Sequence, residues 1–289
     1  MFGKLVKHEF RATGRIIPFV FLVTIFMSLI TITGILLNID ALIGVSFFFL
    51  IITLIAEVIV TYGLLIWRFY KTMCGNEAYL SFTLPVKPRL LYFSKMLVSF
   101  VWVLLSMLVL MLGMSLIVLV IIKGKDTSIA GIIEGIKVMT DFLGFSDHKG
   151  IAILFIIVVT VFSILGGLTS IFFAVTLGST SRFHKFGIGG PILVYLVEYI
   201  SLQMIGMLAF GLIPLALEVT VRLDEGLSYR LVSRNMIEWI LEETKRSATG
   251  AAASEVGLIG IGTYIVLPII LAVLFMATTR IVEKHMSIR

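Results

Sequence analysis

Residues 16–37 of the chain read IIPFVFLVTIFMSLITITGILL, a stretch without a single charged side chain. The hydrocarbon core of a bilayer is about 30 Å thick, and a helix of roughly 20 apolar residues crosses it. A cleavable signal peptide has a shorter apolar core, so we expect this segment to remain as an anchor. The stretch therefore predicts a membrane-spanning helix, and it decides the fold class because further stretches of the same kind follow it.

The whole chain has the composition of a protein dissolved in lipid. Of its 289 residues, 59% are hydrophobic and only 14% are charged, and its mean hydropathy is +1.12. Soluble domains carry about 25% charged residues, which they need for a polar exterior. We therefore expect an all-α, polytopic membrane protein with a single transmembrane domain and six spans. The predicted spans are residues 16–37, 42–67, 96–122, 151–177, 188–217 and 256–279.

Basic residues gather on one side of these spans. Of the 23 Lys and Arg residues, 14 lie in the N-terminal segment, the loop after span two, the loop after span four and the C-terminal tail, with three acids. The opposite side has nine basic residues and twelve acids. Under the positive-inside rule the first side is cytoplasmic, so we expect both termini in the cytoplasm of a protein in the cell (plasma) membrane. The net charge of +6 then indicates contact with anionic membrane lipid, and nucleic-acid binding is not expected.

Three segments outside the spans have amphipathic patterns. Residues 1–15 place apolar side chains on one helical face and basic side chains on the other, which predicts an amphipathic helix on the cytoplasmic leaflet. The outer loops, 123–150 and 218–255, carry two more stripes, for which we expect helices on the outer membrane surface, with a channel cap as the alternative. The stripes are Ile129, Ile132, Ile133, Ile136, Met139 and Leu143 in the first loop, and Val232, Met236, Trp239 and Ile240 in the second.

The sequence lacks the patterns of an enzyme that works inside the membrane. Its four histidines, His8, His148, His184 and His285, all lie outside the predicted spans. There is no His-Glu-x-x-His zinc motif, no G-x-S-x-G nucleophile turn and no G-x-x-x-x-G-K-[ST] phosphate loop. We therefore expect no catalytic residue, cofactor or metal, and we expect any ATP to be hydrolysed by a separate chain.

Two carboxylates lie inside predicted spans, Glu57 in the second and Glu198 in the fifth. An ionised side chain at the bilayer centre costs at least ~2.5–3.5 kcal/mol, so such residues usually face a bundle interior or a wet cavity. Both are therefore candidates for a functional site. The structural alternative, a protonated or hydrogen-bonded carboxyl that holds helices together, is equally compatible with the sequence.

The cytoplasmic loop between spans two and three has a shape of its own. Residues 77–82 are amphipathic enough for a short surface helix, and Pro85 and Pro88 prevent its smooth continuation into the next span. A rigid helix there can pass force from a soluble partner into the spans. An ordinary interfacial turn that anchors two spans fits these residues equally well.

Three segments of the chain resemble the permease subunits of bacterial ABC-2 type ABC transporters. They are Lys4-Leu-Val-Lys-His-Glu-Phe-Arg-Ala-Thr-Gly-Arg15, the loop with Gly75-Asn-Glu-Ala-Tyr-Leu-Ser-Phe-Thr-Leu-Pro-Val86 and Ser94-Lys95, and the basic C-terminal tail. The resemblance implies a six-span subunit that pairs with a second permease subunit, of the same or a homologous chain, and with cytosolic ATP-binding cassette ATPases. In that family the N-terminal helix and this loop contact the ATPase. The implied coupling residues are Gly75, Glu77, Tyr79, Leu80, Phe82, Leu84 and Pro85.

Taken together, these features lead us to expect an exporter driven by a separate ATPase, with a substrate path between two permease subunits. Spans two and five are expected to line that path, because they carry Glu57 and Glu198. One alternative is an ion- or proton-coupled carrier in which the two glutamates relay protons. Another is a membrane scaffold or sensor subunit that does not transport at all.

Overall fold

The computed structural model of the chain describes residues 2–75, 77–83, 85–123, 149–180, 183–187, 189–222, 226–249 and 256–285. Within these residues, six helices are long and apolar enough to cross a membrane, as the sequence predicts. They are α2 (Ile17–Leu37), α3 (Asp40–Met73), α5 (Pro88–Lys123), α7 (Lys149–Gly178), α8 (Gly189–Leu212) and α10 (Gly262–His285). The chain is a multi-pass, mainly α-helical membrane protein. The predicted stripe at 129–143 lies outside the described residues.

Three shorter helices connect or precede the spans. Helix α1 (Phe2–Thr13) and helix α4 (Ala78–Phe82) lie where the sequence predicts short helices, and a 3-10 turn, η1 (His184–Phe186), joins α7 to α8. The leaflet position of α1 and the coupling role of α4 stay predictions.

Four of the predicted spans have clearly different ends in the structure. Helix α3 continues to Met73 rather than ending at residue 67, and α5 begins at Pro88 rather than at residue 96, because hydropathy does not count the polar turns that a helix adds beyond its apolar core. Helix α8 ends at Leu212 rather than at residue 217, because Pro214 has no backbone donor and disfavours helical dihedrals in the residue before it. Helix α10 begins at Gly262, because residues 256–260 form a strand instead of the first turns of the span.

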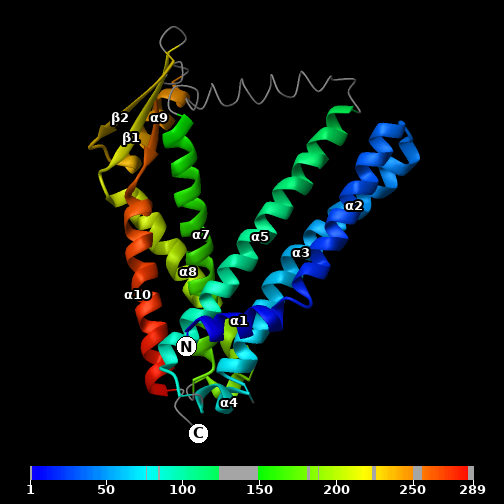
Figure 1. The fold of residues 1–289 in the computed structure, drawn as a ribbon. Helices are drawn as coiled ribbons and strands as arrows, with labels where there is room; N and C mark the ends of the chain where they lie inside the picture. The colour runs from blue at the N-terminus through cyan, green and yellow to red at the C-terminus, as the bar shows by residue number, and fades with distance from the viewer. Residues whose placement is uncertain are drawn as a thin grey trace.

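Consecutive spans run in opposite directions and form two groups (Figure 1). Helices α2 and α3 form a tight hairpin, closed by Asn38 in the left-handed conformation at φ 55°. Helices α7, α8 and α10 pack together as the second group, and α5 contacts both groups. Helices α1 and α4 lie at the end of the bundle where α10 ends, and the groups spread apart toward the other end (Figure 1).

A buried aromatic cluster joins the two groups near the α1 end. The ring of Phe69 on α3 stacks on Phe172 of α7, with centroids 4.0 Å apart and planes 5° from parallel. Tyr92 on α5 meets both rings edge-on, at 6.2 and 6.3 Å. All three side chains are buried, and such ring pairs add about 0.5–1.5 kcal/mol each beyond their burial. The core is therefore tightest at the end that carries α1 and α4.

The segment predicted as the loop 218–255 contributes, with residues on both sides of it, to a small sheet. Strands β1 (Ala216–Arg222), β2 (Gly226–Val232) and β3 (Val256–Gly260) pair antiparallel in the order β2-β1-β3. The all-α expectation missed this sheet, although residues 217–222 alternate between apolar and polar side chains, which is the period of a strand. The predominantly helical fold is otherwise as expected.

Helix α9 (Met236–Ala248) packs on this sheet. Met236 is buried together with Ala216 and Leu258, and Trp239 lies against them. These two side chains belong to the stripe predicted to lie on the membrane surface. In the structure they pack against the sheet, because the strands supply an apolar face, and the position of α9 at a membrane surface stays a prediction.

Candidate functional site

Trp102 of α5 holds helix α1 through a hydrogen bond and a ring contact. The indole N–H of Trp102 donates to the Thr13 hydroxyl oxygen at 2.7 Å, and that hydroxyl donates to the backbone carbonyl of Glu9 at 2.9 Å. The Trp102 ring also packs on Phe10 of α1 and on Phe21 of α2, with centroids 5.7 and 6.2 Å away. A buried indole N–H needs an acceptor, so this chain of bonds sets the register of α1 against α5.

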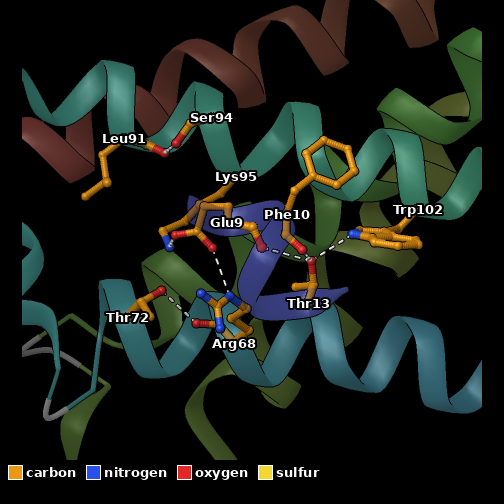
Figure 2. Close-up of polar contacts among 9 residues, drawn as sticks. All are labelled: Glu9, Phe10, Thr13, Arg68, Thr72, Leu91, Ser94, Lys95 and Trp102. Atoms are coloured by element: carbon orange, nitrogen blue, oxygen red, sulfur yellow. Dashed lines mark hydrogen bonds and ion pairs between the residues drawn. The ribbon is translucent and has the colours of Figure 1, made fainter. Parts of the chain in front are cut away.

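Glu9 stands at the centre of an ion-pair cluster between three helices (Figure 2). One carboxylate oxygen accepts a bond from the ammonium of Lys95 on α5 at 2.5 Å, and the other accepts one from the guanidinium of Arg68 on α3 at 2.8 Å. Glu9 is 7% exposed and Lys95 5% exposed. The cluster therefore joins α1, α3 and α5 through groups that water barely reaches.

The cluster keeps Glu9 ionised at neutral pH. Burial alone would raise the pKa of its carboxyl, but the attraction and hydrogen bond of Lys95, aided by Arg68, hold the pKa below its ordinary value of 4.5. Removing one partner of such a buried pair costs about 3–5 kcal/mol, because the other charge is left uncompensated. We therefore expect α1, α3 and α5 to move as one unit at this end of the bundle.

Sequence reasoning missed this cluster, although the sequence carries its signal. Phe2, Leu5, Val6 and Phe10 define the predicted apolar face of α1, and Glu9 falls on that same face at helical spacing. An acid on the buried face of a helix needs a cationic partner. The sequence alone does not say which of the neighbouring basic residues that partner is.

The predicted coupling residues surround α4, just after α3 ends. The backbone N–H groups of Cys74 and Gly75 both donate to the Tyr70 carbonyl at 2.8 Å and so close α3. Glu77 then forms an exposed ion pair with Lys71 at 2.7 Å. An exposed pair contributes only about 0–1 kcal/mol, so this one orients α4 more than it stabilises the fold.

Helix α4 presents apolar side chains to the outside. Tyr79 is 60% exposed and Leu80 54% exposed, and Pro85 is exposed in the segment that leads into α5. Phe82 is the last residue of α4, and Leu84 lies outside the described residues. The predicted coupling residues that the structure describes thus lie on or beside one short exposed helix, and their contact with an ATPase stays a prediction.

A groove of about 530 Å³ lies between α1, α4 and the start of α5. Lys4 and His8 line it from α1, and Leu80 lines it from α4. Glu9 and Arg68 of the ion-pair cluster also belong to its lining. The exposed α4 side chains and the buried cluster are therefore two sides of the same groove.

The two intramembrane glutamates lie in different helix groups. Glu57 on α3 is fully buried and accepts a bond from the Ser106 hydroxyl of α5 at 3.0 Å. The Thr24 side chain of α2 lies near the same carboxyl, and within the described residues the second carboxylate oxygen of Glu57, Oε2, forms no hydrogen bond of good geometry. The carbon atoms of Glu198 on α8 line an apolar groove beside α7 and α10, and its two carboxylate oxygens are buried. The structure therefore does not join the two glutamates into one site.

Comparison with known proteins identifies no relative of the chain: no protein-family model, no curated protein and no solved structure matches it. Within the described residues, no group of three or more His, Cys, Asp or Glu side chains is placed to hold a metal ion. The site is thus defined by its geometry alone, as a short exposed helix above a groove and a buried ion-pair cluster.

Proposed function

We propose that this chain is the membrane-spanning permease subunit of an ATP-driven exporter, and that a separate cytosolic chain hydrolyses the ATP. One observation carries the proposal. A short exposed helix with apolar side chains, α4, borders a groove that is lined in part by Glu9 and Arg68, and these two residues belong to the ion-pair cluster that ties together α1, α3 and α5. Exposed apolar side chains at the polar end of a membrane bundle are a surface for a soluble partner.

The connection of α4 to the spans supplies a path for force. Helix α4 follows α3 after a short turn, and α3 runs unbroken over 34 residues. Because Glu9 joins α3 to α1 and α5, a push on α4 moves these three helices together. The aromatic cluster of Phe69, Tyr92 and Phe172 then acts as the contact about which this group can rock against α7, α8 and α10.

In this proposal transport is a shift of population between arrangements of the two helix groups. ATP binding in the partner favours one arrangement only if the partner binds that arrangement more tightly. A second permease subunit completes the substrate path. The proton-relay carrier is less well supported, because Glu57 and Glu198 lie in separate helix groups.

Purification of the chain from its native membrane in mild detergent, followed by mass spectrometry, tests the proposal. We expect an ATP-binding cassette ATPase to co-purify, and we expect the double substitution of Tyr79 and Leu80 by Ala to release it. The matched control replaces Leu231 and Leu241, two exposed apolar residues at the opposite end of the bundle, and should retain the ATPase.

Two results would contradict the proposal. In one, no ATPase co-purifies although the chain remains folded and monodisperse. In the other, the ATPase is retained by the Tyr79 and Leu80 variant as well as by the control, which would mean that α4 is not the contact.

A further inference from the structure

A pocket of about 280 Å³ lies between the turn that joins α1 to α2 and the last turns of α3. Part of its lining comes from the apolar runs that predict the first two spans, and its charged lining follows the second of these runs. The apolar residues include Ile16, Ile17 and Leu64, and the charged residues are Arg68, Lys71 and Glu77. The pocket therefore lies where the hydrocarbon core of a bilayer meets the headgroup region.

Trp67 marks the same boundary. It lines the pocket and is 60% exposed. Tryptophan gathers at the headgroup level of membrane proteins, because its ring is apolar and its N–H is polar. The next residue, Arg68, is the first basic residue of α3. An apolar run, a tryptophan and then basic residues place lipid headgroups beside this pocket.

The basic side chains of the pocket are open to a ligand. The Lys71 side chain is 51% exposed and that of Arg68 is 26% exposed, and the lining exposes polar as well as apolar atoms. Arg68 gives its Nε–H to Glu9, but a guanidinium has donors on its terminal nitrogens as well, so it can bind a second anion while it holds Glu9. Lys71 pairs with Glu77, and a pair as exposed as this one is weak enough for an anionic ligand to compete with it.

The ionic groups at the pocket have an excess of positive charge. Among the described residues, the charged lining and the ion-pair cluster behind it contain three cations and two carboxylates. The cations are Arg68, Lys71 and Lys95, and the carboxylates are Glu9 and Glu77. A ligand that carries one negative charge would balance this excess.

We propose that the pocket binds an anionic phospholipid, with its phosphate against Lys71 and Arg68 and its acyl chains along Ile16 and Leu64. A phosphodiester carries the single negative charge that the pocket lacks, and Lys and Arg are the side chains that bind phosphate most strongly. Basic pockets between transmembrane helices recognise lipid headgroups in this way. A zwitterionic phospholipid brings its own cation and so leaves the excess uncompensated.

The apolar part of the lining selects the source of the phosphate. Inorganic phosphate or a detached headgroup could meet Lys71 and Arg68, but it would bury no apolar surface against Ile16 and Leu64. Acyl chains bury such surface, and the hydrophobic effect favours that burial. We therefore assign the pocket to an intact lipid.

The lipid would also act on the ion pair that orients α4. Its phosphate competes with Glu77 for Lys71, because both anions approach the same ammonium. Loss of that pair would loosen the attachment of α4 to the end of α3. Binding itself requires neither an ATPase nor transport, so this inference and the proposed function can fail separately.

Native mass spectrometry of the purified chain in detergent tests the inference. The probes are phosphatidylglycerol and phosphatidylcholine with identical acyl chains, each titrated against the chain. We expect the first phosphatidylglycerol to bind about fivefold more tightly or better, because one basic side chain beside an anionic lipid contributes about this factor. Glycerophosphoglycerol, which is the same headgroup without acyl chains, should not compete at equal concentration.

Two substitutions in the pocket should act in opposite directions. Lys71→Gln should weaken the binding of phosphatidylglycerol about fivefold, and Glu77→Gln should strengthen it, because the carboxylate no longer competes for Lys71. The matched control is Lys185→Gln, which removes an exposed cation from η1, outside the pocket. It should leave the binding of phosphatidylglycerol within about twofold.

A variant that loses its fold cannot bind lipid more tightly, so Glu77→Gln keeps the test decisive if Lys71→Gln does not fold. The inference is overturned if the unchanged chain binds the two lipids equally, or if the detached headgroup competes as well as the intact lipid. It is also overturned if both pocket variants bind like the unchanged chain, or if Lys185→Gln weakens binding as much as Lys71→Gln does. The last result would assign the preference to the overall charge of the surface.

Discussion

Replacing Glu9 by Gln tests the ion-pair cluster that ties α1 to α3 and α5. The substitution keeps the shape of the side chain but removes the negative charge that Lys95 and Arg68 share. Lys95, at 5% side-chain exposure, cannot turn to water and is left beside a second cation. Arg68, at 26%, is partly hydrated and loses less.

The expected cost follows from this difference in exposure. Breaking a buried pair costs about 3–5 kcal/mol, and the partial exposure of Arg68 places the estimate for Glu9→Gln near the lower end, at about 3 kcal/mol of unfolding free energy. Lys95→Met removes the buried cation and leaves Glu9 paired with Arg68, so it should cost about 1 kcal/mol. The double variant contains neither buried charge and should be more stable than Glu9→Gln alone.

Reversible unfolding in mixed micelles, followed by far-ultraviolet circular dichroism, measures these free energies. The double-mutant cycle should give a coupling energy of about 2 kcal/mol or more between Glu9 and Lys95. The reasoning is refuted if Glu9→Gln costs less than about 1 kcal/mol or if the two substitutions are additive. Either result would mean that the cluster does not hold the three helices together.

Three further predictions concern the same end of the bundle. Trp102→Phe keeps an aromatic ring at this position but removes the hydrogen-bond donor to Thr13, so the unfolding free energy should fall by about 1 kcal/mol. Adding Thr13→Val to this variant should change the unfolding free energy little, because the bond is already lost. If the two substitutions give additive losses in micelle unfolding, the Trp102–Thr13 hydrogen bond does not contribute to stability. Gly178→Ala should cost about 2 kcal/mol, because its Cβ would lie 2.4 Å from the Pro191 nitrogen, whereas Gly167→Ala meets open space and should be neutral or stabilising. The contribution of Glu9 to stability should be constant above about pH 4.5 and decrease below it, because a lowered pKa in Glu9 contributes stability that is lost as the pH falls through its folded value. A pH profile of Glu9→Gln should lack this decrease, and an unchanged profile would assign it to other groups.

The spans were predictable because each depends on a local property. A run of about 20 apolar residues specifies a transmembrane helix whatever its neighbours are, since every backbone donor is satisfied within the helix itself. The same argument misplaced the ends at Leu212 and Gly262, because hydropathy does not distinguish an apolar strand from the continuation of a helix. The alternation after Leu217 indicated a strand, but it lay at the end of an apparent span.

The candidate site was predictable in part for a similar reason. The exposed helix around Tyr79 and the proline at position 85 were visible as a local pattern, and the structure places a helix there. The groove behind it was not predictable, because α1, α3, α4 and α5 each contribute to its lining. Its ATPase partner stays a prediction.

The sequence by itself determined that the chain is a mainly helical membrane protein, how many times it can cross, and which two spans contain a carboxylate. Only the tertiary structure decided what those charges do. Glu9 meets Arg68 and Lys95 across 59 and 86 residues of sequence, while Glu57 meets Ser106 and Glu198 meets an apolar cavity. Hydropathy is a property of each segment and can be read along the chain. The environment of a buried charge is a property of the surfaces that pack around it, and these come together only when the helices do.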